Sequence, residues 1–189
     1  MTESDETREF IDMKTLPLWT FALLALGLTG CGGGGGSAAD FSSCVTISGG
    51  ATQTAFSSSG CVGCSTADQA AAIDNNFDTA ARINFPANST GSASLQATAQ
   101  SGITYAGGNI AAVALGQGPV GSRITVSTYM GAALQDDGTL STSFVDRNGA
   151  AIAYIRTTRP FNAVRYTITS RGGGTETVGI REFCSNART

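Results

Sequence analysis

Apolar and polar residues alternate along several segments of the chain, and a period of two is typical of half-buried β-strands. Four segments carry this pattern: residues 93–99, 123–127, 164–169 and 177–181. The chain is also rich in Ser, Thr, Gly and Val and poor in long helix-forming runs. Its only helical candidate is short, from Thr66 to Ile73, with Asp68 near the start. These patterns predict an all-β protein.

Two dipeptides between the alternating segments, Asp137-Gly138 and Asn148-Gly149, have the composition of tight hairpin turns. Asn, Asp and Gly adopt the positive φ angles that such turns require. With these turns, the span from Ser122 to Phe183 predicts an antiparallel run of about five strands. Regularly spaced strands and turns favour an antiparallel β-sandwich.

Histidine is absent, which excludes His-based catalytic triads, His general bases and His metal ligands. A glycosidase could still use two carboxylates, and Asp136-Asp137 is the only adjacent acidic pair beyond residue 30. Turn chemistry before Gly138 explains that pair, so we expect no enzyme and no catalytic residue. Beyond residue 30 acidic and basic residues are equal in number and the arginines are scattered. We therefore expect no nucleic-acid binding.

A short apolar run, residues 16–28, follows Lys14 and ends at Leu28-Thr29-Gly30-Cys31, just before a glycine tract. The run is shorter than the roughly 20 apolar residues that span a bilayer. A basic residue, a brief apolar core and small residues before a cysteine indicate a processed export signal. The segment resembles the signal peptide and lipobox of bacterial lipoproteins. The resemblance implies cleavage before Cys31 and acylation of Cys31, with palmitate for example, at its thiol and its new amino group.

The predicted organisation has three parts: a leader and signal peptide over 1–30, the lipidated cysteine and a Gly/Ser/Ala linker over 31–42, and a β-sandwich domain over 43–189. Acidic residues before Met13 do not fit a positive leader, so we expect translation to start at Met13. Two or more acyl chains anchor a protein stably in a membrane. We therefore expect a lipid-anchored protein of the cell envelope. In a cell with two membranes the outer membrane is favoured, because Gly32 replaces the aspartate that retains lipoproteins at the inner membrane.

An even number of cysteines remains after Cys31, and in an exported protein this indicates disulfides. They are Cys44, Cys61, Cys64 and Cys184. The spacing of Cys61-Val-Gly-Cys64 also occurs in redox and zinc pairs, but neither a βαβ unit nor a second close pair accompanies it here. Four cysteines allow three pairings, and the spacing alone does not choose between them.

Residues 72–80, Ala-Ile-Asp-Asn-Asn-Phe-Asp-Thr-Ala, resemble the Asp-Gly-Asn-x-x-Thr loop of discoidin-type, galactose-binding-like domains. Further matches lie at residues 128–129, 159–165 and 180–184, and the likeness covers roughly Cys61 to Cys184. These domains are jelly rolls common in lectins and carbohydrate-binding modules. The resemblance therefore implies a galactose-binding-like β-sandwich.

In many such domains the Asp loop and a Glu on the last strand hold a structural calcium ion. Carried over residue by residue, the resemblance implies four calcium ligands: Asp74, Asn76, Thr79 and Glu182. Asn75 stands where the family often has Gly, and asparagine tolerates a left-handed conformation better than most residues. Oxygen ligands of this kind suit calcium.

The phase of the last strand gives a separate argument. Glu182 and Cys184 share the phase of Val178 and Ile180, so both should face the core. A buried carboxylate needs a partner, which is an arginine, a network of hydrogen-bond donors or a cation, unless the alternation has already ended at Glu182. A buried Cys184 supports a disulfide from the final strand to Cys61 or Cys64.

Two functions of different classes are compatible with these features. The first is a non-catalytic module that binds a glycan or another cell-surface ligand, with ligand-binding residues that the sequence leaves unassigned. The alternative is a structural or assembly lipoprotein that contacts envelope proteins and binds no small ligand. The balanced charge and the few aromatic residues fit both.

Overall fold

The computed structural model describes residues 45–47, 52–117, 123–140, 145–147, 150–170 and 172–187. The strands among them are β1 (Val45–Thr46), β2 (Gln53–Ser59), β3 (Ser65–Ala67), β4 (Ala81–Phe85), β5 (Ser92–Thr98), β6 (Ile110–Gln117), β7 (Arg123–Met130), β8 (Ala133–Leu140), β9 (Val145–Arg147), β10 (Ala150–Arg156), β11 (Ala163–Thr169) and β12 (Glu176–Ala187). The described helical structure is one 3-10 helix, η2 (Gln69–Ala72). Within these ranges, no helix has the length and apolar character needed to cross a membrane.

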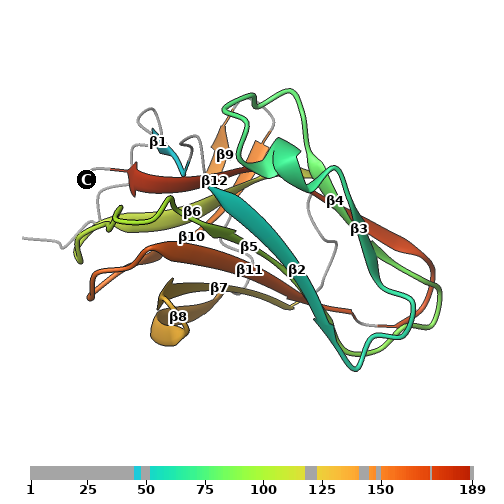
Figure 1. The fold of residues 1–189 in the computed structure, drawn as a ribbon. Helices are drawn as coiled ribbons and strands as arrows, with labels where there is room; N and C mark the ends of the chain where they lie inside the picture. The colour runs from blue at the N-terminus through green and yellow to red at the C-terminus, as the bar shows by residue number, and fades with distance from the viewer. Residues whose placement is uncertain are drawn as a thin grey trace, which may run out of the picture. The chain divides into compact units, whose positions relative to one another are not determined.

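The strands form two antiparallel sheets that pack face to face (Figure 1). The seven-stranded sheet has the order β3-β4-β12-β6-β10-β9, with β1 paired to β12. The five-stranded sheet has the order β2-β5-β11-β7-β8. The expected all-β antiparallel sandwich is therefore confirmed.

The alternation in the sequence places the core between the sheets. Leu95 on β5, Val126 on β7 and Tyr166 on β11 are fully buried, and each is flanked by more polar neighbours. They meet Val113 on β6 and Ile180 on β12 from the opposite sheet in one hydrophobic cluster. Because successive side chains of a strand point to opposite faces, the polar partners of these residues cover the outer face.

The predicted turn at Asp137-Gly138 is wrong, because both residues lie inside β8. The β7–β8 hairpin turns instead at Gly131 and Ala132, where Gly131 has a φ of 59°. Gly138 has a packing role, since a Cβ there would lie 2.5 Å from Ile155 Cγ2. The other predicted turn, at residues 148–149, lies outside the described residues.

The predicted helix over residues 66–73 is only partly right. Residues 65–67 form β3, and the helical part is confined to η2. Asp68, between them, has a φ of 54°, which separates the strand from the 3-10 turn. Between residues 122 and 183 the described part of the chain forms six strands, β7 to β12, where about five were expected.

The orientation expected for Glu182 and Cys184 is wrong, although both are buried. The register between β12 and β6 shifts from Ile180 to Glu182, which marks an irregularity at Arg181. As a result Phe183, not Glu182, continues the inner side with Ile180. Cys184 packs in a separate cluster on the other side of the seven-stranded sheet, with Ile110, Ala112 and Ile152. The alternation therefore ends before the glutamate, as one of the interpretations of the sequence allowed.

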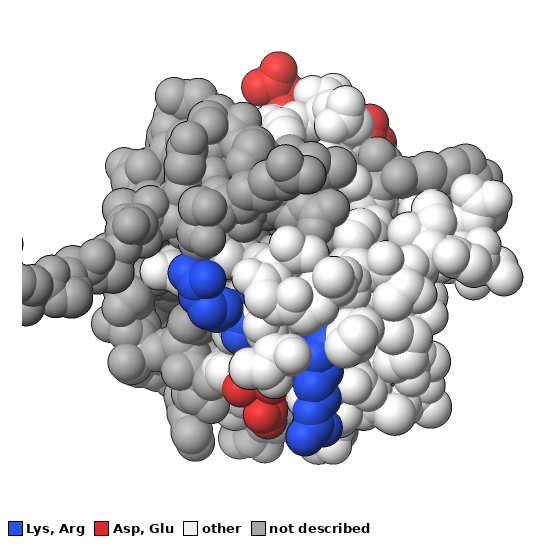
Figure 2. All heavy atoms as spheres, turned by 90° about the vertical axis from the view of Figure 1, so that its left-hand side faces the viewer, with Lys and Arg blue, Asp and Glu red and all other residues white. Residues whose placement is uncertain are grey.

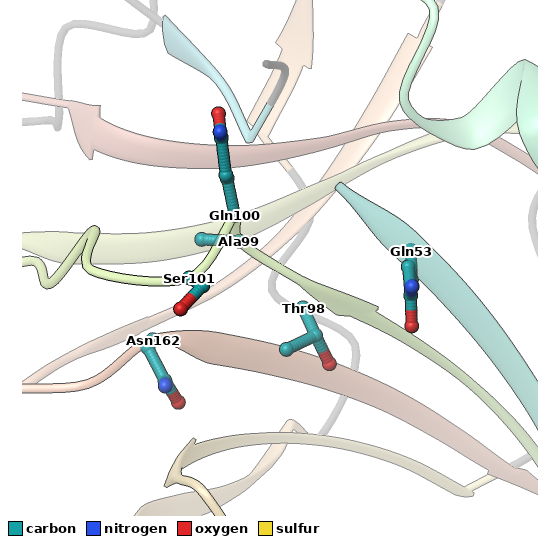
Figure 3. Close-up of a pocket in the computed structure, with 6 residues that line it drawn as sticks. All are labelled: Gln53, Thr98, Ala99, Gln100, Ser101 and Asn162. Atoms are coloured by element: carbon teal, nitrogen blue, oxygen red, sulfur yellow. The ribbon is translucent and has the colours of Figure 1, made fainter. Parts of the chain in front are cut away.

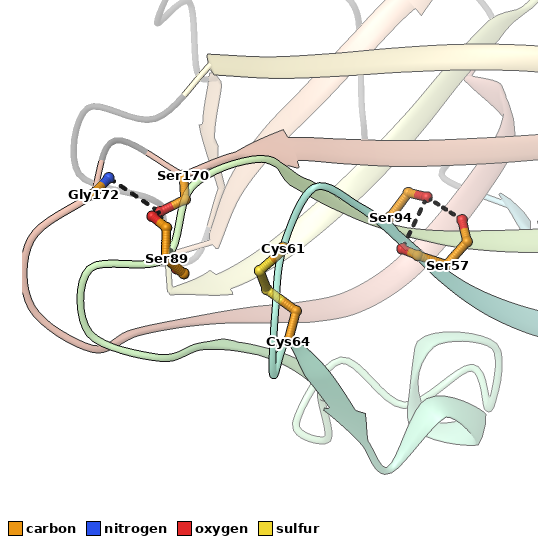
Figure 4. Close-up of a disulfide and its surroundings, with 7 residues drawn as sticks. All are labelled: Ser57, Cys61, Cys64, Ser89, Ser94, Ser170 and Gly172. Atoms are coloured by element: carbon orange, nitrogen blue, oxygen red, sulfur yellow. Dashed lines mark hydrogen bonds between the residues drawn. A yellow bond between two sulfur atoms is a disulfide. The ribbon is translucent and has the colours of Figure 1, made fainter.

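Cys61 and Cys64 form a disulfide with each other across the turn between β2 and β3 (Figure 4). The predicted pairing of Cys184 with one of them is therefore wrong. Gly63, with a φ of 78°, closes the turn and brings the two Cα atoms within 5.6 Å. Cys184 is disulfide-bonded as well. Cys44 and the acylation site Cys31 lie outside the described residues.

Candidate functional site

The Asp74 loop, between η2 and β4, is shaped by its own side chains. Asp74 Oδ1 accepts a hydrogen bond of 2.9 Å from the Asn76 amide, which bends the loop into an Asx turn. Asn75 adopts the left-handed conformation, with a φ of 60°. Its Oδ1 accepts a 2.9 Å hydrogen bond from the Thr46 hydroxyl of β1. Asn75 thus has the left-handed conformation that the likeness to an Asp-Gly-Asn loop implied.

Thr79 closes the same loop. Its hydroxyl lies 2.8 Å from Asp74 Oδ2 and 2.8 Å from the Asn76 carbonyl oxygen. The hydrogen bond from Thr79 lowers the pKa of Asp74, and the Asn76 amide acts in the same direction. Asp74 is therefore an ionised carboxylate at neutral pH, on the exposed side of the loop.

Glu182, on β12, contacts this loop from its buried side. Its side chain is fully buried, and its Oε1 accepts a 2.9 Å hydrogen bond from the Asn76 amide. Oε2 has no hydrogen-bond partner among the described residues. Burial raises the pKa of Glu182 to about 8, and the Asp74 carboxylate acts in the same direction. One backbone amide therefore lies between two carboxyl groups that differ strongly in proton affinity.

The structure brings together the four residues predicted as calcium ligands. Asp74 and Glu182 both contact the Asn76 amide, and Thr79 contacts Asp74. An arginine partner of Glu182, the alternative to a cation, is absent within the described residues, where the ion pair formed is Arg82–Asp68. In the described part of the chain no three His, Cys, Asp or Glu residues cluster as metal ligands. Any cation here would therefore depend on neutral oxygens as well as two carboxyl groups.

A pocket of about 400 Å³ opens at the end of the sandwich where β5 ends (Figure 3). It is lined by Gln53, Thr98, Ala99, Gln100, Ser101 and Asn162. Gln53, Thr98 and Asn162 point to the same side in Figure 3, away from the seven-stranded sheet. Figure 2 shows the left-hand side of the view in Figure 1, where most of the described surface is uncharged. The pocket thus offers amides and hydroxyls on a largely apolar lining.

Asp136, on β8, has a structural role, because its carboxylate is hydrogen-bonded to the backbone after β10. Its carboxylate accepts hydrogen bonds from the backbone amides of Thr158 (3.1 Å) and Arg159 (3.2 Å). Burial opposes ionisation, but the hydrogen bonds from Thr158 and Arg159 outweigh it, and the pKa of Asp136 is lowered. Asp137 follows in the same strand and points to the opposite face. The two carboxylates therefore point to opposite faces of the sheet. The pair is part of strand β8 and not of a turn, as the sequence had suggested.

Comparison with known proteins finds similarity only in structure. No protein-family model matches the chain, and no curated protein matches it. The lectin-binding domain of lectinolysin, solved with Lewis b, has 18% sequence identity and a TM-score of 0.51. The match covers 77% of this chain and 97% of that domain. The chain shares the antiparallel β-sandwich fold of this domain.

Two carbohydrate-binding modules are similar to a lower degree. The family 32 module of NanJ from C. perfringens, solved with galactose, has 17% identity, a TM-score of 0.44 and coverage of 71% of this chain and 92% of the module. TmCBM61, solved with β-1,4-galactotriose, has 12% identity, a TM-score of 0.41 and coverage of 70% and 86%.

The Asp74 loop could be found from the sequence, but the pocket could not. The loop has a recognisable order of Asp, Asn and Thr, so it can be recognised from residues that are close together in the sequence. The pocket draws Gln53 from β2, Thr98 from β5 and Asn162 from the loop before β11. No local motif links these three. Only the pairing of β5 with both β2 and β11 brings them together.

Proposed function

We propose that the β-sandwich is a non-catalytic glycan-binding domain and that the pocket at its end is the binding site. The observation that supports this is a pocket lined by uncharged amides and hydroxyls. Such groups donate and accept hydrogen bonds with sugar hydroxyls without the desolvation cost of a charge. The lectin-binding domain of lectinolysin, which shares the fold, was solved with Lewis b.

A glycan array with the full-length chain should yield oligosaccharide ligands. Replacing Gln53 and Ser101 together by Ala should weaken binding about thirtyfold, since each of the two lost hydrogen bonds contributes on the order of 1 kcal/mol. Gln69→Ala, on η2, is the matched control and should bind normally. No binding across neutral and acidic glycans, combined with cross-linking to one envelope protein, would instead support the structural lipoprotein alternative.

We further propose that the Asp74 loop and Glu182 hold a calcium ion. The support is the buried Oε2 of Glu182, which lacks a partner among the described residues, beside an ionised Asp74. Asp74 and Glu182 would supply carboxylate oxygens, and Asn76 and Thr79 would supply carbonyl and hydroxyl oxygens. This set of oxygen donors suits calcium. The ion's role would be to fix the loop against β12.

Calcium at about one hundred times its dissociation constant should raise the melting temperature by roughly 5–10 °C, because it binds only the folded state. The rise should disappear in Asp74→Asn, which removes one carboxylate. Asp78→Asn changes the charge by the same amount in the same loop and should keep the rise. Equal melting with calcium and with chelator in the parent chain would contradict the calcium site.

We also propose that the protein is exported and anchored in a membrane by acylated Cys31. The support is sequence alone: Lys14, the short apolar run and Leu28-Thr29-Gly30 before the cysteine. Expressed in a bacterium that processes lipoproteins, the parent chain should fractionate with membranes, and Cys31→Ala should appear in the soluble fraction. Parent protein with an uncut, unmodified N-terminus by mass spectrometry would contradict this anchor.

A further inference from the structure

Arg165 lies beside the pocket, in the middle of the five-stranded sheet. On β11 it pairs with Gln96 of β5 on one side and with Ser127 of β7 on the other. Its neighbour Tyr166 points into the core and is fully buried. Successive side chains of a strand alternate between faces, so Arg165, Gln96 and Tyr129 share the outer face. Arg165 is half-buried there.

The guanidinium group of Arg165 is held in place by uncharged partners. It stacks 4.3 Å above the centre of the Tyr129 ring. Its Nε–H donates a 3.0 Å hydrogen bond to Gln96 Oε1, and a terminal nitrogen donates one of 3.0 Å to the Tyr129 hydroxyl. A guanidinium has five N–H donors, so others remain for a ligand. An arginine fixed in this way loses little conformational freedom when it binds.

The charge of Arg165 is not neutralised by the residues that the structure describes. The ion pair among them joins Arg82 and Asp68. Asp137 shares the outer face but sits opposite Ser127, two strands away and about 10 Å from Arg165 by strand spacing. A positive charge is thus held in an array of neutral hydroxyls and amides.

Hydrogen bonds through Gln96 and Tyr129 connect this arginine to the pocket. The Gln96 amide that binds Arg165 also donates a 3.0 Å hydrogen bond to the Thr98 hydroxyl, and Thr98 lines the pocket. On the other side, the backbone N–H of Asn162 donates a 2.8 Å hydrogen bond to the backbone carbonyl of Tyr129, and Asn162 also lines the pocket. A sugar chain that leaves the pocket along this face would therefore meet the guanidinium next.

We infer that the site selects acidic glycans, and that Arg165 binds the carboxylate of a uronic acid unit next to the sugar in the pocket. This inference rests on the proposed glycan-binding function. Arginine and carboxylate form paired N–H···O hydrogen bonds, which are about twice as strong as neutral ones. Tyr129 and Gln96 act as positioning residues for the guanidinium, and the neutral pocket binds the adjoining sugar.

Oligogalacturonate and its methyl ester provide matched probes, because esterification removes the charge and leaves the sugar unchanged. With the full-length chain in buffer of fixed calcium content, calorimetry should show the acid binding at least tenfold more tightly than the ester. Arg165→Gln should remove this difference, and Arg165→Lys should restore it only in part, because lysine lacks the planar pair of donors. Arg156→Gln, at an exposed position on β10, makes the same charge change and should keep the preference. The melting temperature of each variant verifies folding.

The outcomes separate the two proposals. If acid and ester bind equally and Arg165→Gln changes neither, the selection of acidic glycans is overturned while glycan binding stands. If neither probe nor any glycan on the array binds, both proposals are overturned. If the acid is preferred but Arg156→Gln abolishes the preference as well, general charge attraction explains it and the role of Arg165 is overturned.

Discussion

The calcium-free protein should lose stability as the pH rises from about 5 to about 8, because of Glu182. Its pKa is raised from 4.5 to about 8 in the folded state. Between these values the folded chain holds a proton that the unfolded chain has released, so the free energy of unfolding falls with pH. The contribution of Glu182 is complete below 4.5, declines up to about 8 and is then lost. The total loss should be on the order of a few kcal/mol.

Urea denaturation at a series of pH values, in the presence of chelator, measures this effect. Glu182→Gln carries no titrating proton, so its stability should be nearly constant across the window. Asp78→Asn, on the exposed side of the same loop, should keep the slope of the parent chain. Asp74 and Asp136 do not interfere, because their pKa values are lowered and their contributions are lost only in more acidic solution. A slope that survives in Glu182→Gln would refute the assignment.

Gly91→Ala should destabilise the domain by about 3 kcal/mol or more. Gly91 has a φ of 92°, a conformation that alanine rarely adopts. A Cβ there would also lie 2.4 Å from the Ser59 carbonyl oxygen and 2.4 Å from the Gly60 carbonyl carbon. Both are backbone atoms next to the Cys61–Cys64 disulfide turn, so the clash is relieved only by moving the backbone.

Thermal and urea unfolding of Gly91→Ala would measure this loss. The matched control is Gly108→Ala, because Gly108 has a similar φ of 90° but a Cβ there would meet no atom within 4 Å. Its cost should be limited to the conformational strain of about 1 kcal/mol. The difference in unfolding free energy between the two variants therefore measures the close approach of the β2–β3 and β4–β5 loops. Equal destabilisation would show that backbone strain, not contact, sets the role of Gly91.

The strands could be predicted because alternation is a local property. In β5 and β11 the apolar residues of the sequence are those that face the core, as Leu95 and Ile168 show. The pattern failed at Arg181, where an irregularity in β12 reverses the inward side. No residue type marks that position, since the shift arises from pairing with β6, which is distant in sequence. Burial of Glu182 was thus expected for the wrong reason.

Turn prediction failed at Gly138 for a related physical reason. Glycine occurs both where φ is positive and where a side chain would not fit, and the sequence alone does not separate these cases. Gly138 belongs to the second kind, against Ile155 of β10, a residue from the opposite sheet. Likewise, nothing local distinguished Arg165 from the other arginines. Its stacking on Tyr129 depends on the pairing of β11 with β7.

Asn162 links the pocket to a backbone amide whose NMR signal would report ligand binding. Its side-chain Oδ1 accepts a 3.0 Å hydrogen bond from the Gly131 amide at the tip of the β7–β8 hairpin. The side chain that would contact a sugar therefore also holds a backbone proton visible by NMR. A ligand that forms a hydrogen bond with the Asn162 side-chain amide would change the chemical shift and the solvent exchange rate of the Gly131 amide proton. Occupancy could be followed at a single glycine resonance, without a label on the sugar.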